Sequence, residues 1–214
     1  MVRPRAHALL IDLDDVVRRY DPAVNAAVEA RYGLAPGSVL AVALEPDIVH
    51  PAVTGQVTRA RWLEATARAL AGRAVLDADA AHDLLREWGA YRGEVVPEAL
   101  GFVREVRAAG RPVALATNAT DELSDDLARL GLAGEFDAVV NSSTLGVAKP
   151  APGYYAAACA AVDTPPERCL FVDDSDRNVR GARAAGLPAF RWNGPADLPY
   201  LRAVLDLDGA RHNE

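Results

Sequence analysis

The stretch His7-Ala8-Leu9-Leu10-Ile11-Asp12-Leu13-Asp14-Asp15-Val16-Val17 decides the fold, because an apolar run ends abruptly in closely spaced carboxylates. The residues from Ala8 to Ile11 predict a buried strand. Side chains alternate along an extended backbone, so we expect Asp12 and Asp14 to face one crevice where the strand leaves its sheet. Two carboxylates at that spacing repel each other and raise each other's pKa. The pair therefore indicates either a bound metal ion or a shared proton.

Composition limits the kind of protein that holds this crevice. The chain has 214 residues, of which 50% are hydrophobic and 25% charged, as in an ordinary globular protein of one or two domains. A net charge of -7 and a pI of about 5.1 argue against general affinity for nucleic acid or an anionic membrane, so we expect a small-molecule partner. Cys159 and Cys169 are too few for a disulfide scaffold, and we expect buried thiols. No apolar stretch before Asp12 is long enough for a signal peptide or a membrane span, and the expected location is the cytoplasm.

Residues 17–92 predict a bundle of helices without a convincing strand. Segment 45–51 carries two prolines, and we expect it to interrupt the helical pattern as a loop. Thr58 is a plausible cap for a helix from Arg59 to Leu70, whose apolar residues recur at helical spacing. This part of the chain is therefore predicted to form a helical-bundle cap domain.

From Pro97 onward helices and strands alternate, which is typical of a parallel sheet with crossover helices. The strand at 8–11 must join this sheet, because a lone strand cannot satisfy its backbone groups. The predicted strands are 8–11, 112–116, 136–140, 169–172 and 187–190. The predicted fold class is thus α/β, a Rossmann-like parallel sheet flanked by helices. Residues 1–16 and 93–214 form its core domain, and residues 17–92 form the inserted cap.

Polar side chains follow several of these strands at the edge where open parallel sheets bind ligands. The residues at this edge are Asp12, Asp14, Thr117, Asn118, Lys149, Asp173, Asp174 and Ser175. A cation, a hydroxyl group with adjacent backbone N–H groups and several carboxylates on one rim suit a doubly charged anion held together with Mg²⁺. The pattern predicts a phosphoryl site. Taken singly, each element is more commonly a helix cap, a turn or a solvated loop residue.

Four segments carry a resemblance to a known family. They are Asp12-Leu13-Asp14-Asp15-Val16, Leu115-Ala116-Thr117-Asn118, Val147-Ala148-Lys149-Pro150, and Phe171-Val172-Asp173-Asp174-Ser175 continuing to Asn178. In this order they resemble the four motifs of the haloacid dehalogenase superfamily of phosphohydrolases. The helical insertion is similar to that family's type-one cap, and residues 55–62 resemble the cap segment of small-molecule phosphatases and of the phosphatase domain of epoxide hydrolases. Asp15 stands where the family commonly has glycine.

The resemblance implies a role for each motif residue. Asp12 would be the nucleophile that forms an aspartyl phosphate, and Asp14 would be the general acid and base. Mg²⁺ would be bound by Asp12, the backbone carbonyl of Asp14, and Asp174. The residues implied to bind the phosphoryl group are Thr117, Asn118 and Lys149, and those implied to support the metal ligands are Asp173 and Asn178. The implied substrate is a small phosphorylated metabolite.

Three other functions share this fold. A haloacid dehalogenase would need neither a second acid for a leaving alkoxide nor Mg²⁺, so Asp14 and Asp174 argue against it. A sugar phosphomutase would need cap residues that rebind a bisphosphate intermediate, and the sequence shows no sign of them. A non-catalytic binding protein of the same fold would have no need for intact acids in the motifs. We therefore expect a Mg²⁺-dependent phosphatase whose cap closes over the crevice as a lid.

Overall fold

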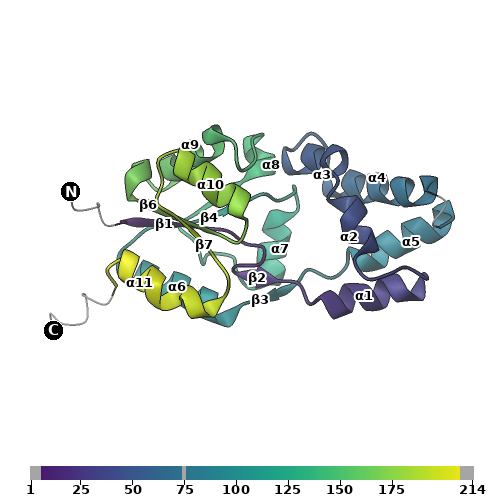
Figure 1. The fold of residues 1–214 in the computed structure, drawn as a ribbon, viewed down its shortest axis with the longest axis horizontal. Coiled ribbons are helices and arrows are strands. Elements are labelled where there is room, and N and C mark those ends of the chain that lie inside the picture. The colour runs from purple at the N-terminus through teal and green to yellow at the C-terminus, as the bar shows by residue number, and fades with distance from the viewer. Residues whose placement is uncertain (1–5, 74–75, 208–214) are drawn as a thin grey trace.

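The computed structural model describes residues 6–73 and 76–207. Within these ranges the main sheet is parallel and has the strand order β5-β4-β1-β6-β7 (Figure 1). Its strands are β1 (Ala8–Ile11), β4 (Val113–Thr117), β5 (Ala138–Asn141), β6 (Cys169–Asp173) and β7 (Ala189–Arg191). The predicted α/β class and the five predicted strands are confirmed. β1 lies in the centre, with Leu10 level with Ala114 on one side and with Phe171 on the other.

Alternation along β1 divides the core into two layers. Leu9 and Ile11 pack against a cluster that includes Phe102 and Leu201, whereas Leu10 packs against a cluster that includes Tyr154. The helices on the first face are α6 (Pro97–Ala108), α7 (Leu123–Arg129) and α11 (Leu198–Val204); those on the second are α9 (Pro152–Ala161) and α10 (Asp176–Ala184). Because every residue of β1, β4 and β6 is buried, the sheet is covered on both faces, as parallel sheets usually are.

The insertion after β1 is helical and has its own apolar core. Its helices are α1 (Pro22–Arg31), α2 (Ser38–Ala43), α3 (Pro46–Val53), α4 (Arg59–Gly72) and α5 (Ala78–Trp88), which lie together to one side of the sheet in Figure 1. Leu70 and Leu84 are buried between α4 and α5, and Trp62 packs edge to face against Trp88, with ring centroids 6.4 Å apart. Thr58 caps α4 as predicted, since its hydroxyl accepts a hydrogen bond from the backbone of Arg61.

Two local predictions are wrong. Segment 45–51 is not a loop, because Pro46 occupies the first turn of α3, where its missing N–H costs nothing. Pro51 lies inside α3 and forfeits one helical hydrogen bond, while the burial of Ala52 still favours the helix. Residues 17–92 also contain a strand, β2 (Arg18–Arg19), which pairs antiparallel with β3 (Glu94–Val95). Two-residue strands have no periodicity that a sequence pattern could reveal.

Two further expectations concern the chain as a whole. Cys159 and Cys169 are buried free thiols, as predicted. None of the helices in the described ranges has the length and apolar character needed to cross a lipid bilayer. The cytoplasmic location stays a prediction.

Candidate active site

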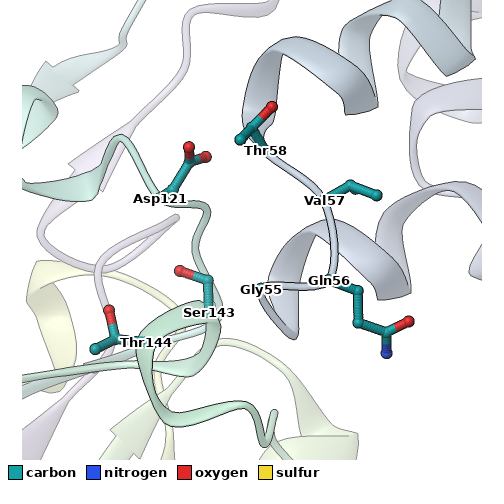
Figure 2. A pocket seen from close by; sticks show the side chains of 7 residues that line it. All are labelled: Gly55, Gln56, Val57, Thr58, Asp121, Ser143 and Thr144. Carbon is teal, nitrogen blue, oxygen red and sulfur yellow. The ribbon is translucent and has the colours of Figure 1, made fainter.

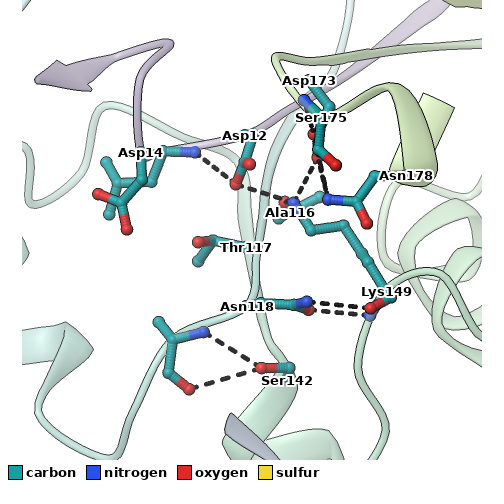
Figure 3. Close-up of polar contacts among 12 residues, drawn as sticks. Asp12, Asp14, Ala116, Thr117, Asn118, Ser142, Lys149, Asp173, Ser175 and Asn178 are labelled. Carbon is teal, nitrogen blue, oxygen red and sulfur yellow. Dashed lines mark hydrogen bonds and ion pairs between the residues drawn. The ribbon is translucent and has the colours of Figure 1, made fainter. Parts of the chain in front are cut away.

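Lys149 lies at the centre of the polar residues beyond the strand ends (Figure 3). Its ammonium is 2.9 Å from Asp12 Oδ1 and 2.6 Å from Asp173 Oδ2, and it donates to the carbonyl of Ala116 at 2.9 Å. The side chain is almost completely buried, and the ammonium also lies over the ring of Phe171, 5.6 Å from its centroid. A buried cation needs such compensation, because desolvation of an isolated charge is very costly.

Asp12 directly follows β1 and faces Lys149. Its backbone N–H donates to the carbonyl of Val172, which keeps the residue in register with β6, and its Oδ1 accepts from the N–H of Leu13 at 2.8 Å. Burial raises the pKa of Asp12 to about 8, with a further contribution from the Asp173 charge, while Lys149 acts in the opposite direction. A carboxylate with a raised pKa is a stronger base and nucleophile once it is ionised.

Asp173 ends β6 and is fully buried. Besides the Lys149 ammonium, it accepts hydrogen bonds from the backbone N–H of Ser175 at 2.8 Å and from the amide of Asn178 at 3.1 Å. Both carboxylate oxygens are therefore engaged by the protein. Asn178 lies in the first turn of α10 and orients Asp173 rather than reaching Asp12 directly.

Asp174 completes a cluster of three acids. One carboxylate oxygen from each of Asp12, Asp173 and Asp174 lies within 4.8 Å of the others. Mg²⁺ binds oxygen at about 2.1 Å, so two of its ligands are at most about 4.2 Å apart, and small side-chain rotations would bring the cluster into that range. Asp174 is only half-buried, and within the described ranges no side chain donates to its carboxylate. The donor set fits a hard divalent cation, with Asp12 and Asp174 as the freer ligands.

Asp14 lies at the same edge but has a different partner. Its Oδ1 accepts a hydrogen bond from Nε of Arg18 at 2.6 Å, and its side chain is 42% exposed to solvent. The Asp14 charge still contributes to raising the pKa of Asp12, which indicates that the two carboxylates sense each other. Asp15 adopts a left-handed conformation with φ +58°, the geometry in which glycine is favoured. Aspartate is one of the few other residues that adopt this conformation at moderate cost.

Thr117 is the last residue of β4 and Asn118 follows it; both lie between Asp12 and the loop of Lys149 (Figure 3). The Asn118 side chain accepts from the backbone N–H of Lys149 at 2.8 Å and donates to its carbonyl at 3.1 Å, which fixes that loop. The hydroxyl of Ser142 accepts from the N–H of Ala119 at 3.1 Å. Thr117 is buried, and its carbonyl accepts from the hydroxyl of Tyr154.

A cleft of about 260 Å³ separates the helical insertion from the core (Figure 2). Residues 55–58 form one wall, and Asp121, Ser143 and Thr144 form the other. The two walls are also joined, because Oδ1 of Asp121 accepts from the backbone N–H of Arg59 at 2.7 Å. A core carboxylate thus binds the N-terminus of α4, where a negative charge is favourable.

Comparison with known proteins identifies the family. The profile of the haloacid dehalogenase-like hydrolases matches residues 6–186, most of the chain. The chain belongs to this family. It is 36% identical to a phosphoserine phosphatase of Thermus thermophilus over 52% of this chain and 48% of that protein, and 26% identical to hexitol phosphatase A of Escherichia coli over 94% and 89%. The chain spans about half the length or less of the first curated relatives that it matches.

Solved structures of haloacid dehalogenase-like proteins share the fold at low identity. An enzyme of Bacteroides thetaiotaomicron in complex with magnesium and inorganic phosphate superposes with a TM-score of 0.66 at 18% identity, over 87% of this chain and 93% of that one. The L-2-haloacid dehalogenase of Xanthobacter autotrophicus with chloropropionic acid covalently bound gives 0.65 at 23% identity, over 87% and 77%. Phosphatases and dehalogenases thus both occur among the similar proteins, and the family alone does not choose between them.

The site contains residues that sequence reasoning did not assign. Ser142 and Tyr154 hold the backbone after β4 through the hydrogen bonds described above, and the N–H of Ser175, a residue already expected at this edge, binds Asp173. Arg18 was not assigned to the site either, yet its side chain is 4% exposed and contacts Asp14. A basic residue four positions after the second acid was the only available signal, and many surface arginines share that spacing.

Proposed function

We propose that this chain is a Mg²⁺-dependent hydrolase of phosphomonoesters that works through an aspartyl phosphate on Asp12. The observation that carries the proposal is the placement of Asp12, directly after the central strand, beside the Lys149 ammonium and the carboxylates of Asp173 and Asp174. A nucleophile beside a fixed cation suits attack on a doubly charged phosphoryl group.

In the first step an Asp12 carboxylate oxygen forms a bond to phosphorus, and the bond from phosphorus to the ester oxygen breaks. Asp14 gives its proton to the departing alcohol, which would otherwise leave as a costly alkoxide. In the second step water attacks the same phosphorus and Asp14 takes its proton, so that Asp12 is regenerated and phosphate leaves. Splitting one displacement in two is the usual benefit of covalent catalysis.

The surrounding groups would stabilise the charge on phosphorus. Lys149, the Thr117 hydroxyl and the Asn118 backbone amide would bind the phosphoryl oxygens. Asp12 and Asp174, together with the backbone carbonyl of Asp14, would hold Mg²⁺, and Asp173 and Asn178 would keep Lys149 and the metal ligands in place. The metal would supply additional positive charge toward the phosphoryl group.

Dehalogenation of 2-haloacids is the competing function, because dehalogenase structures share this fold. In that reaction Asp12 would attack carbon and displace halide, a leaving group that needs no proton. The two acids Asp14 and Asp174 would then have no task. Their presence beside Asp12 supports phosphoester hydrolysis.

The insertion supports a preference for small substrates. We infer that residues 17–92 act as a movable cap over residues 1–16 and 93–214, with the two connections near β2 and β3 as hinges. A closed cap would exclude bulk water and strengthen ionic contacts to the phosphoryl group. A cap that closes over the strand ends would leave room chiefly for compact esters, which disfavours a phosphoprotein loop. A small phosphorylated metabolite of the cytoplasm is the substrate class that we propose.

A screen of phosphorylated metabolites tests the function. Purified protein is incubated with each ester in Mg²⁺ and in a chelator, and released phosphate is measured. Parallel incubation with a short 2-haloacid, read as released halide, tests the competing function. We expect phosphate release that needs Mg²⁺ and disappears in Asp12→Asn. Halide release without phosphate release would reverse the choice.

A further inference from the structure

Arg18 is a buried cation that bridges two carboxylates. Its Nε donates to Oδ1 of Asp14 at 2.6 Å, and its Nη1 donates to Oδ2 of Asp126 at 3.1 Å. Asp126 lies on α7 in the core and is itself only 10% exposed, whereas Asp14 is 42% exposed. The planar guanidinium fork presents donors in fixed directions, so a group anchored at one edge holds its other donors still.

The rest of the Arg18 side chain is also fixed. Its backbone belongs to β2 and pairs with Val95 of β3, and its guanidinium lies over the ring of Tyr20 at 5.1 Å. Gly93 packs directly against the aliphatic stem: a Cβ at that glycine would lie 2.9 Å from Cγ of Arg18. Gly93 also has φ +79°, so two independent features favour glycine where the stem passes.

Asp14 has little else to fix its orientation. Among the described residues, Arg18 is the partner of its carboxylate, and a half-exposed aspartate without such a bond would sample several rotamers. A charge-assisted hydrogen bond of 2.6 Å selects one orientation. The backbone is tied at the same point, because the N–H of Arg18 donates to the carbonyl of Leu13.

We propose that Arg18 is a positioning residue that holds the Asp14 carboxylate in the orientation from which it protonates the leaving alcohol. This inference rests on the proposed function of Asp14. Arg18 keeps its proton at any ordinary pH, so it orients the acid without taking part in proton transfer itself. Proton transfer requires a donor within hydrogen-bond reach, and a freely rotating Asp14 would spend most of its time elsewhere.

Further ion pairs connect Asp14, through Arg18 and Asp126, to helix α4 of the insertion. Asp126 is 3.2 Å from Nη1 of Arg92, whose Nη2 donates to Glu122 at 2.6 Å. Glu122 in turn lies 3.5 Å from Nη1 of Arg59, the first residue of α4. Ion pairs of alternating sign therefore run from the proposed acid to the first turn of α4 in the insertion. Asp126 should matter for the same reason as Arg18, because it anchors the guanidinium.

Dependence on the leaving group separates positioning from a general structural role. An aryl phosphate with a weakly basic leaving group needs little help from an acid, whereas an alkyl phosphate needs its departing oxygen protonated. The value of kcat/KM reports on the first, phosphoryl-transfer step for both esters. We expect Arg18→Gln to lower kcat/KM for the alkyl ester by about 10 to 100-fold, the usual range for residues that orient catalytic groups, and to change the aryl ester by less than about threefold.

Three further variants control the interpretation. Arg19→Gln removes the same charge from the neighbouring, solvent-facing residue and should leave both esters unchanged, since Arg19 is 65% exposed. Asp126→Asn keeps Arg18 but weakens its anchor, and should give the same ester selectivity with a smaller loss; it also tests the idea if Arg18→Gln unfolds. In Asp14→Asn, adding Arg18→Gln should cause no further loss, because the residue acts through Asp14.

The outcomes are distinct. An equal fall with both esters in Arg18→Gln, or an additional loss in the double variant, would overturn the positioning role. A wild-type protein inactive toward both esters would overturn the proposed function on which that role rests. Thermal unfolding of each variant shows whether a uniform loss comes from reduced stability.

Discussion

Gly55 contacts the backbone of Ser143 so closely that no other residue fits. A Cβ at Gly55 would lie 2.1 Å from the carbonyl oxygen of Ser143, and the glycine has φ +71°. Gly55 belongs to the insertion, and Ser143 lies in α8 (Ser142–Leu145) of the core, directly after the Ser142 hydroxyl that holds the loop following β4. At this contact the insertion packs directly against the backbone of the core.

Gly55→Ala should prevent the close contact between Gly55 and Ser143. We expect kcat/KM for metabolite esters to fall by about tenfold or more, because a cap that cannot close leaves the site open to water. Gly37→Ala is the matched control: its φ of +83° makes the strain similar, but no atom lies within 4 Å of the added Cβ. It should lower stability by about 1 kcal/mol and spare activity. Equal activity in the two variants would mean that the contact has no role in turnover.

Beryllium fluoride with Mg²⁺, which mimics an aspartyl phosphate, should slow hydrogen exchange at residues 54–58 and at the connections near β2 and β3 in the wild type. The slowing should be absent in Gly55→Ala. Unchanged exchange in the wild type, with binding shown by calorimetry, would identify the insertion as a fixed wall.

Asp173 and Asp174 should differ in their effect on metal binding. Asp174→Asn should raise the Mg²⁺ concentration needed for half-maximal activity more than Asp173→Asn does, because Asp173 is already bonded to Lys149, Ser175 and Asn178. Asp173→Asn should instead lower the free energy of unfolding, by about 1 to 3 kcal/mol, since it weakens a buried network. Metal titrations of activity and urea unfolding measure the two effects. The reverse order in the metal titrations would assign the ligand role to Asp173.

Mg²⁺ binding should tighten as the pH rises toward 8. Burial raises the pKa of Asp12 to about 8 in the metal-free protein and also raises that of Asp174. Below that pH a proton occupies the ligand and must leave when the metal binds, so the dissociation constant should fall by up to about tenfold per pH unit between 6 and 8. Calorimetry in two buffers of different ionisation enthalpy measures the released proton. A constant affinity without proton release would show that Asp12 is already ionised.

Asp15 should tolerate glycine and not valine. Its φ of +58° is accessible to aspartate and glycine but strained for a β-branched residue. Asp15→Val should therefore lower the free energy of unfolding by about 1 to 2 kcal/mol, while Asp15→Gly should stay within about 0.5 kcal/mol of the wild type. Because the side chain is exposed, lost packing does not confuse the comparison. Equal stability of the valine variant would exclude backbone strain as the reason for the residue at this turn.

Much of the fold and of the site was predictable because the rules involved are local. The apolar run before Asp12 and the helix-strand alternation after Pro97 predict a parallel sheet, and such a sheet places its strand ends at one edge. That reasoning brings Asp12, Lys149 and Asp173 together, as the structure does.

The remaining features depend on contacts distant in sequence. The Arg18–Asp126 hydrogen bond joins residues 108 positions apart, and no sequence pattern near Arg18 predicts it. The helix around Pro51 forms because Ala52 is buried by tertiary packing, which outweighs one missing hydrogen bond. The left-handed turn at Asp15 has no clear sequence signal, because aspartate is also common in ordinary turns and helix caps.

Direct detection of the covalent intermediate tests the central claim most sharply. Wild-type protein is mixed with a radiolabelled phosphoryl ester and Mg²⁺, quenched in acid during turnover and digested, and the labelled peptide is sequenced by mass spectrometry. We expect the phosphoryl label on Asp12, in the peptide that spans β1, and none in Asp12→Asn. A phosphoryl label on any other residue, or turnover without a labelled intermediate, would contradict Asp12 as the nucleophile.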